Sequence, residues 1–300
     1  MTEKIKITFL GTSGMIPDEK RNHPAFFVQY ANEGILVDCG EGTQTQFRKA
    51  KLNPCSITKI LLTHWHGDHT LGLPGLLKTI SMSEYTRKLE IYGPRGIKKR
   101  IAEMFQAFGP ITEYPIEVKE VYGKFFETKD FYLEAEEMDH NTPCNAYALV
   151  VKENIRIDKK KLKASKIKPG PVLQKLKLGK DIVYEGKKYL AKNLTFREEG
   201  KKISFVLDTV VNGKIVPLVK NSNVFVCESS FHSELEAKAK EYKHMTSKQA
   251  AEMAKKAGVK KLILTHLSQR YENQLGRILQ DAKKVFKNVS IANDLDVVLV

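Results

Sequence analysis

Apolar and polar residues alternate along several short stretches near the N-terminus, a pattern typical of half-buried β-strands. Residues 4–10 place an apolar side chain at every second position. The runs 25–30 and 34–37 lie close together and predict a β-hairpin. The intervening residues 11–14 lack the G-x-G-x-x-G spacing of a dinucleotide-binding turn, so we expect an irregular loop near the functional site.

Helical spacing of apolar residues follows these strands. It covers residues 44–51, 71–80 and 97–108, with a strand-like run at 89–92, and residues 247–257 form a later helix candidate. Strands and helices therefore alternate along the chain, which indicates an α/β architecture with helices covering the sheet faces.

A six-residue sequence in the first half of the chain recurs, with small changes, in the second half. KILLTH at residues 59–64 returns as KLILTH at 261–266, and each apolar run ends in a histidine, His64 or His266. The match is explained either by a true repeat or by the frequency with which aliphatic runs precede loops. Either explanation makes His266 a candidate ligand from the second half.

The segment that begins at His64 carries four side chains able to bind a metal within six residues: His64, His66, Asp68 and His69. Imidazole and carboxylate together suit a borderline cation such as Zn²⁺, and no cysteine pair is present for a structural zinc knuckle. His140 and Asp208 also follow strand-like runs. With His266, these residues supply three ligands for each of two metals, provided that one carboxylate bridges.

Composition describes an ordinary soluble globular protein, with 42% hydrophobic and 28% charged residues in a chain of 300. That length allows one large domain or two modest ones. Neither a long apolar segment nor the pattern of a signal peptide occurs, which favours a cytoplasmic protein. The four cysteines are widely scattered, and we expect reduced, packed thiols rather than disulfides.

Positive charge is concentrated in one part of the chain. The formal net charge is +15. Residues 152–192 account for +10 of it, because thirteen lysines and Arg156 stand against Glu153, Asp158, Asp181 and Glu185. Pro169, Gly170 and Pro171 interrupt regular structure at its centre, so we expect a protruding insertion. Such a segment is either a solvated lysine-rich loop or a contact for an anionic partner such as nucleic acid.

The H-x-H-x-D-H pattern resembles the signature of the metallo-β-lactamase superfamily. More narrowly, the chain resembles the ribonuclease Z family, the tRNA 3′-processing endoribonucleases. That resemblance extends over nearly the whole chain and rests on FLGTS at 9–13, GLPGL at 72–76, HMT at 244–246, THLSQRY at 265–271 and the basic insertion with Gly170-Pro171.

The resemblance implies one catalytic domain over residues 1–300, folded as an αββα sandwich, with residues 152–192 as a protruding basic arm that binds tRNA. It further implies two zinc ions per subunit, one held by His64, His66 and His140 and the other by Asp68, His69 and His266, with Asp208 bridging. Asp68 would accept a proton through its unligated oxygen, and His244 would donate one to the leaving oxygen, unless it is simply a surface histidine.

Residues for substrate binding follow from the same resemblance. Arg270 would hold a phosphate, unless it forms a structural ion pair, and Thr246 would lie beside the substrate, unless it is only a helix N-cap. The arm would offer Lys168, Gly170, Pro171, Lys175 and Lys177. Precursor tRNA is the implied partner, and a homodimer is the implied assembly.

Three functions remain open on these grounds. A zinc endonuclease would remove the 3′ trailer of precursor tRNA, leaving a 3′ hydroxyl on the tRNA and a 5′ phosphate on the trailer. A small-molecule phosphodiesterase or arylsulfatase would use the same metal scaffold but has no use for the basic insertion. A nucleic-acid-binding protein with a structural metal would favour a closed, cysteine-rich site, which this chain lacks.

Overall fold

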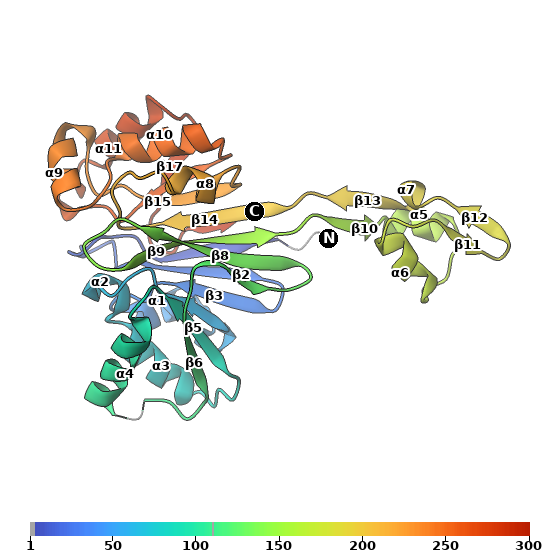
Figure 1. Ribbon diagram of the computed structural model, residues 1–300, viewed down its shortest axis with the longest axis horizontal. Coiled ribbons are helices and arrows are strands. Elements are labelled where there is room, and N and C mark those ends of the chain that lie inside the picture. Colours follow the sequence, from blue (N-terminus) through green and yellow to red (C-terminus); the bar gives the residue numbers. More distant parts are fainter. Residues whose placement is uncertain (1–3, 110) are drawn as a thin grey trace.

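Two seven-stranded β-sheets pack face to face, and helices cover the outer face of each (Figure 1). The computed structural model describes residues 4–109 and 111–300. The four layers confirm the predicted α/β sandwich, and a narrow arm projects far from one side of it.

The first sheet has the order β18-β1-β2-β3-β4-β5-β6, antiparallel from β18 to β3 and parallel from β3 to β6. Its strands are β1 (Lys6–Gly11), β2 (Ala25–Tyr30), β3 (Glu33–Val37), β4 (Lys59–Leu61), β5 (Leu89–Gly93), β6 (Ile116–Glu120) and β18 (Val297–Leu299).

The second sheet has the order β17-β16-β15-β14-β9-β8-β7, parallel from β17 to β14 and antiparallel from β14 to β7. Its strands are β7 (Gly123–Glu127), β8 (Phe131–Met138), β9 (Cys144–Val151), β14 (Lys201–Val206), β15 (Val224–Glu228), β16 (Leu262–Thr265) and β17 (Val289–Ile291).

Helices on the first sheet are α1 (Thr43–Lys49), α2 (Gly67–Thr70), α3 (Leu73–Ser81) and α4 (Ile97–Phe108). Those on the second are α8 (Ile215–Val219), α9 (Glu236–Glu241), α10 (Ser247–Ala257) and α11 (Leu275–Lys283). Short 3-10 helices occupy Pro54–Ser56, Ser233–Leu235 and Gln269–Tyr271.

The largest side chains lie in the layer between the sheets. Phe9, Phe26 and Tyr92 of the first sheet meet Tyr147 and Phe205 of the second, all essentially inaccessible to solvent. Their alternate neighbours on each strand face the helices, because successive side chains of a strand point to opposite faces. Burial on both faces holds the two sheets in a fixed relation and so fixes the loops at the strand ends.

The predicted hairpin of residues 25–30 and 34–37 is confirmed as β2 and β3, and the predicted helices 97–108 and 247–257 as α4 and α10. The helix expected at 71–80 begins two residues later. Gly72 lies so close to the backbone of Gly40 that a Cβ atom there would come within 2.0 Å of the Gly40 oxygen. Pro74 then fits the first turn of α3, where no N–H is needed.

The arm is built on a two-stranded antiparallel ribbon of β10 (Asn154–Ile157) and β13 (Thr195–Glu198). Its tip contains α5 (Lys159–Ala164), α6 (Val172–Lys177), α7 (Ala191–Leu194) and the hairpin of β11 (Ile182–Tyr184) and β12 (Lys187–Tyr189) (Figure 1). Ile167, Leu176 and Ile182 bury their side chains in a small apolar cluster of the tip. The tip therefore folds around its own core, away from the sandwich.

Within the described residues, no helix is both long and apolar enough to cross a lipid bilayer. The four cysteines form no disulfide in the described residues; Cys39, Cys144 and Cys227 are buried, whereas Cys55 is only half-buried.

Candidate functional site

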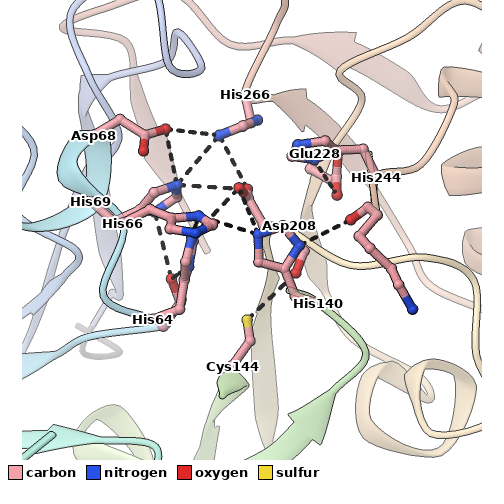
Figure 2. Close-up of polar contacts among 12 residues, drawn as sticks. His64, His66, Asp68, His69, His140, Cys144, Asp208, Glu228, His244 and His266 are labelled. Carbon is pink, nitrogen blue, oxygen red and sulfur yellow. Dashed lines mark hydrogen bonds and ion pairs between the residues drawn. The ribbon is translucent and has the colours of Figure 1, made fainter. Parts of the chain in front are cut away.

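Seven histidine and aspartate side chains converge at one end of the sandwich, between the two sheets (Figure 2). The segment after β4 supplies His64 and His66, and the short helix α2 supplies Asp68 and His69. His140, Asp208 and His266 follow β8, β14 and β16 of the other sheet. The carboxyl ends of strands from both sheets therefore bring together all seven residues that the sequence nominated.

The first group consists of His64, His66, His140 and Asp208. The Nε2 atom of His64 lies 3.0 Å from the Nδ1 atom of His66. The Nε2 atom of His140 lies 3.3 Å from the same Nδ1 and 3.8 Å from Oδ2 of Asp208. Three ring nitrogens and one carboxylate oxygen thus face a common centre.

The second group consists of Asp68, His69, Asp208 and His266. The Nε2 atoms of His69 and His266 lie 3.3 Å apart, and each lies 3.3 Å from Oδ2 of Asp68. The other oxygen of Asp208, Oδ1, lies 3.1 Å from Nε2 of His266. Asp208 therefore presents one oxygen to each group.

These distances fit metal ions. Ligands bonded at about 2.0 to 2.2 Å in a tetrahedral arrangement lie about 3.3 to 3.6 Å from one another. The Nε2 atoms of His69 and His266 face each other at 3.3 Å, and a neutral ring whose single N–H lies on Nδ1 has no proton to pair them. A cation between them would satisfy every lone pair at once. Oδ1 of Asp68 and Oδ1 of Asp208 are also buried without a hydrogen-bond donor.

The opposite nitrogen of each buried ligand histidine has a partner that sets its orientation. Nδ1 of His69 lies 2.6 Å from Oδ2 of Asp38, and Nδ1 of His266 lies 2.9 Å from Oγ of Ser230. Asp38 also accepts hydrogen bonds from the backbone N–H and the hydroxyl of Thr63, at 2.7 and 2.8 Å. Such partners orient metal ligands and raise their basicity.

Two of these residues have an unusual backbone conformation. Asp38 has a φ of 56° and His266 a φ of 54°, in the left-handed region that non-glycine residues rarely occupy. Strained conformations of this kind occur mostly where the surrounding structure requires one side-chain direction. Here the side chain of Asp38 points toward His69, and the side chain of His266 points into the second group.

His244 lies beside the ligand cluster and forms a pair with a buried carboxylate. Its Nδ1 atom lies 3.1 Å from both oxygens of Glu228. Burial opposes the charged imidazole, but the carboxylates of Glu228 and Asp208 outweigh it and raise the pKa of His244 to about 9. Glu228 is itself fixed by donors from Thr209 and Ser230, at 2.8 and 2.7 Å. The raised pKa keeps His244 protonated at neutral pH, and Glu228 holds it in one orientation.

The pKa of Asp68 is shifted the other way. Burial favours the neutral acid, but His69 and His266 outweigh it and hold the pKa of Asp68 well below its usual range. Asp68 is accordingly ionised at neutral pH.

Sequence reasoning missed three residues of the site: Asp38, Glu228 and Ser230. Asp38 and Glu228 both stand at the ends of apolar strands, the same signal that nominated Asp208. Their partners His69 and His244 are 31 and 16 positions away in the chain, so only the folded structure reveals the pairs.

A cavity of about 800 Å³ opens beside the cluster. Arg270 lines it, with its guanidinium 5.2 Å from the ring centre of Phe231. Gly14, from the loop expected near the site, also lines it and packs against the ring of His266. Thr246 is fully buried, and its hydroxyl accepts a hydrogen bond from the backbone N–H of Gln249, so its contacts are those of the helix N-cap considered above.

The candidate residues of the basic insertion belong to α6 and the loop before it, in the arm that projects from the sandwich (Figure 1). All five of them are exposed to solvent: Lys168, Gly170, Pro171, Lys175 and Lys177.

The chain is similar to known proteins of one superfamily. Residues 19–145 match the metallo-β-lactamase superfamily. The chain is 40% identical to ribonuclease Z of Archaeoglobus fulgidus, over 96% of this chain and 95% of the relative. It is 37% identical to ribonuclease Z of Listeria monocytogenes, over 98% of both chains.

A solved structure also resembles this chain over nearly its full length. The crystal structure of human tRNase Z, short form, superposes with a TM-score of 0.71 at 28% identity, over 98% of both chains. The chain belongs to the ribonuclease Z family, the tRNA-processing endoribonucleases of the metallo-β-lactamase superfamily.

Proposed function

We propose that the protein is a zinc-dependent endoribonuclease that removes the 3′ trailer from precursor tRNA, leaving a 3′ hydroxyl on the tRNA and a 5′ phosphate on the trailer. The observation that carries this proposal is the pair of ligand groups joined by Asp208, open on one side to a cavity that also contains His244.

His64, His66 and His140 would hold one zinc ion, Asp68, His69 and His266 the other, and Asp208 would bridge them. Bound there, two zinc ions supply a water activated near neutral pH and positive charge against the phosphate oxygens. The donor set supports zinc, since imidazole nitrogens and carboxylate oxygens are ligands that it prefers.

The roles of the remaining residues follow from their positions. Oδ1 of Asp68 is buried and unpaired, so it can accept the proton of the attacking water. His244 carries a proton and faces the cavity, so it can protonate the departing 3′ oxygen of the tRNA. Glu228 is a positioning residue that keeps His244 charged and correctly turned.

Metal analysis tests the ligand assignment. The wild-type chain is expected to bind about two zinc ions, His140→Ala about one, and Asp208→Ala fewer than one, because loss of a bridge weakens both sites. Lys177→Gln, on the arm, serves as the control and should bind the wild-type amount. Wild-type zinc content in Asp208→Ala would contradict a bridging role.

Substitution of His244 tests the proposed acid. His244→Ala is expected to lower the rate constant for precursor tRNA cleavage by about 10² to 10⁴. Hydrolysis of a bis(p-nitrophenyl) phosphodiester should fall far less, because nitrophenolate departs without protonation. Single-turnover rates on both substrates make this comparison.

The two substrates also distinguish a variant that has lost proton donation from one whose metal site is disrupted. Glu228→Gln should show the same selective loss in milder form, since the amide still contacts Nδ1 but no longer holds the charge. Equal losses on both substrates would mean that His244 supports the metal site instead of donating a proton.

The arm would hold folded tRNA through lysine–phosphate contacts, and Arg270 would hold a phosphate in the cavity. We also propose a homodimer in the cytoplasm, in which one subunit's arm could reach tRNA cut by the other. The molar mass in solution tests the dimer, and a monomer at working concentration would reject it.

A further inference from the structure

A second hollow, of about 200 Å³, lies beside the ligand cluster on the side of the first sheet. It is formed by three segments that follow β4, β5 and β8. The side chains that matter to its chemistry are those of Trp65, Arg95, Lys99, Arg100, Thr142 and Pro143.

This hollow and the main cavity are lined by consecutive residues of the chain at two points. Trp65 lines the hollow, whereas its neighbour His66 lines the main cavity. Thr142 lines the hollow, whereas its neighbour Asn141 lines the main cavity. The two hollows therefore lie on either side of the chain segments at 65–66 and 141–142.

The lining of the hollow combines an aromatic plane with positive charge. Trp65 is only partly buried. Arg95 is exposed and has no ion-pair partner among the residues the structure describes, and Lys99 and Arg100 share a single carboxylate, that of Glu103, at 3.8 and 3.3 Å. Aromatic planes that stack bases beside cations that contact phosphates are the means by which proteins hold single-stranded nucleic acid.

The backbone N–H groups at the start of α4 contribute little to the binding of phosphates in this hollow. The N–H of Gly96 already donates to a carboxylate oxygen of Glu120, at 3.0 Å. The side chains of the hollow therefore carry the inference.

The reaction geometry indicates which part of a substrate would reach the hollow. In the function proposed above, on which this inference rests, the leaving oxygen belongs to the tRNA and lies near His244. His244 lines the main cavity and is absent from the lining of the hollow. The trailer is attached through a different ester oxygen of the same phosphate, so it must leave in another direction, and the hollow beyond His66 is the basic exit next to the cluster.

We propose that this hollow binds the 3′ trailer as single-stranded RNA. A trailer nucleobase stacks on Trp65, and the phosphates that follow it contact Arg95, Lys99 and Arg100. Such contacts are tolerant of sequence, which suits a segment that differs from one precursor to the next.

Trp65 is the only tryptophan of the chain, so its fluorescence reports on the hollow directly. A 5′-phosphorylated single-stranded tetraribonucleotide, titrated into the zinc-loaded protein, should quench this fluorescence. Arg95→Glu should raise the half-saturating concentration by about tenfold. Lys98→Glu is the matched control, because Lys98 is exposed on the same helix outside the lining, and it should shift the titration much less.

Two results of the titration would overturn the proposal. One is the absence of quenching in the wild-type protein. The other is an equal shift in Arg95→Glu and Lys98→Glu, which would mean that only the general charge of the helix matters.

Cleavage kinetics provide a second test. Trp65→Ala and Arg95→Glu should raise KM about tenfold for precursor tRNA with a trailer of about ten nucleotides, and leave KM unchanged for a one-nucleotide trailer. Equal effects on both precursors would assign these residues to the support of the metal site and reject the proposal. If the wild-type protein cut neither precursor, the proposed function would fail, while the fluorescence titration would still decide the hollow.

Discussion

Replacing Asp68 with asparagine is expected to lower cleavage of precursor tRNA by about a thousandfold or more, with the protein still folded. The carboxylate lies between His69 and His266 through Oδ2, whereas Oδ1 is buried and unpaired. Asparagine keeps an oxygen for the metal but loses the basic oxygen that would accept a proton from water. Single-turnover cleavage of a 3′-extended tRNA measures the effect.

Zinc content shows whether a variant loses activity because it lacks the proton acceptor or because it has lost zinc. Asp68→Asn should keep most of its zinc, and Asp68→Ala should lose part of it along with activity. The pKa of Asp68 lies well below its usual range, so the wild-type side chain is already ionised at neutral pH. Near-normal cleavage by the asparagine variant would show that another group accepts the proton.

Removal of the arm tip is expected to weaken binding of precursor tRNA by about a hundredfold at moderate salt, while hydrolysis of a small phosphodiester is unchanged. Ile157 and Thr195 are paired across the ribbon of β10 and β13, so residues 158–194 can be replaced by an Asn-Gly turn without disturbing either strand. This deletion removes all five buried residues of the tip's apolar cluster, whereas a deletion of 157–188 would leave Ala191 and Leu194 without their partners.

Salt dependence shows whether the arm acts through phosphate contacts. Neutralising Lys168, Lys175 and Lys177 with glutamine should weaken binding by about tenfold and make it less sensitive to salt. Fluorescence anisotropy of labelled precursor tRNA provides both quantities. Full affinity after deletion of the tip would assign tRNA binding to the sandwich and leave the lysines as a solvated surface.

The metal ligands could be predicted from the sequence because they follow a local rule. His64, His140, Asp208 and His266 each come after an apolar strand, and strand ends on one side of a sandwich meet in space. The same rule applies to Asp38 and Glu228, but neither carries a motif, and their role depends on partners brought close only by the fold.

The arm shows a second reason why parts of the structure could not be predicted from the sequence. Its prolines and glycine predicted an interruption of regular structure, but the small core of Ile167, Leu176 and Ile182 is spread over residues that show no clear helical or strand period. The second hollow could not be predicted from the sequence either, because Trp65, Arg95 and Thr142 come from three separate loops. Contacts between loops leave no periodic trace in a sequence.

Cleavage of a 3′-extended tRNA by the purified, zinc-loaded protein tests the central claim most directly, with the product ends mapped and a small phosphodiester assayed beside it. We expect one cut close to the discriminator base, with a 3′ hydroxyl on the tRNA and a 5′ phosphate on the trailer. Hydrolysis of the small ester alone, with the precursor left intact, would contradict it and assign the metal site to a general phosphodiesterase.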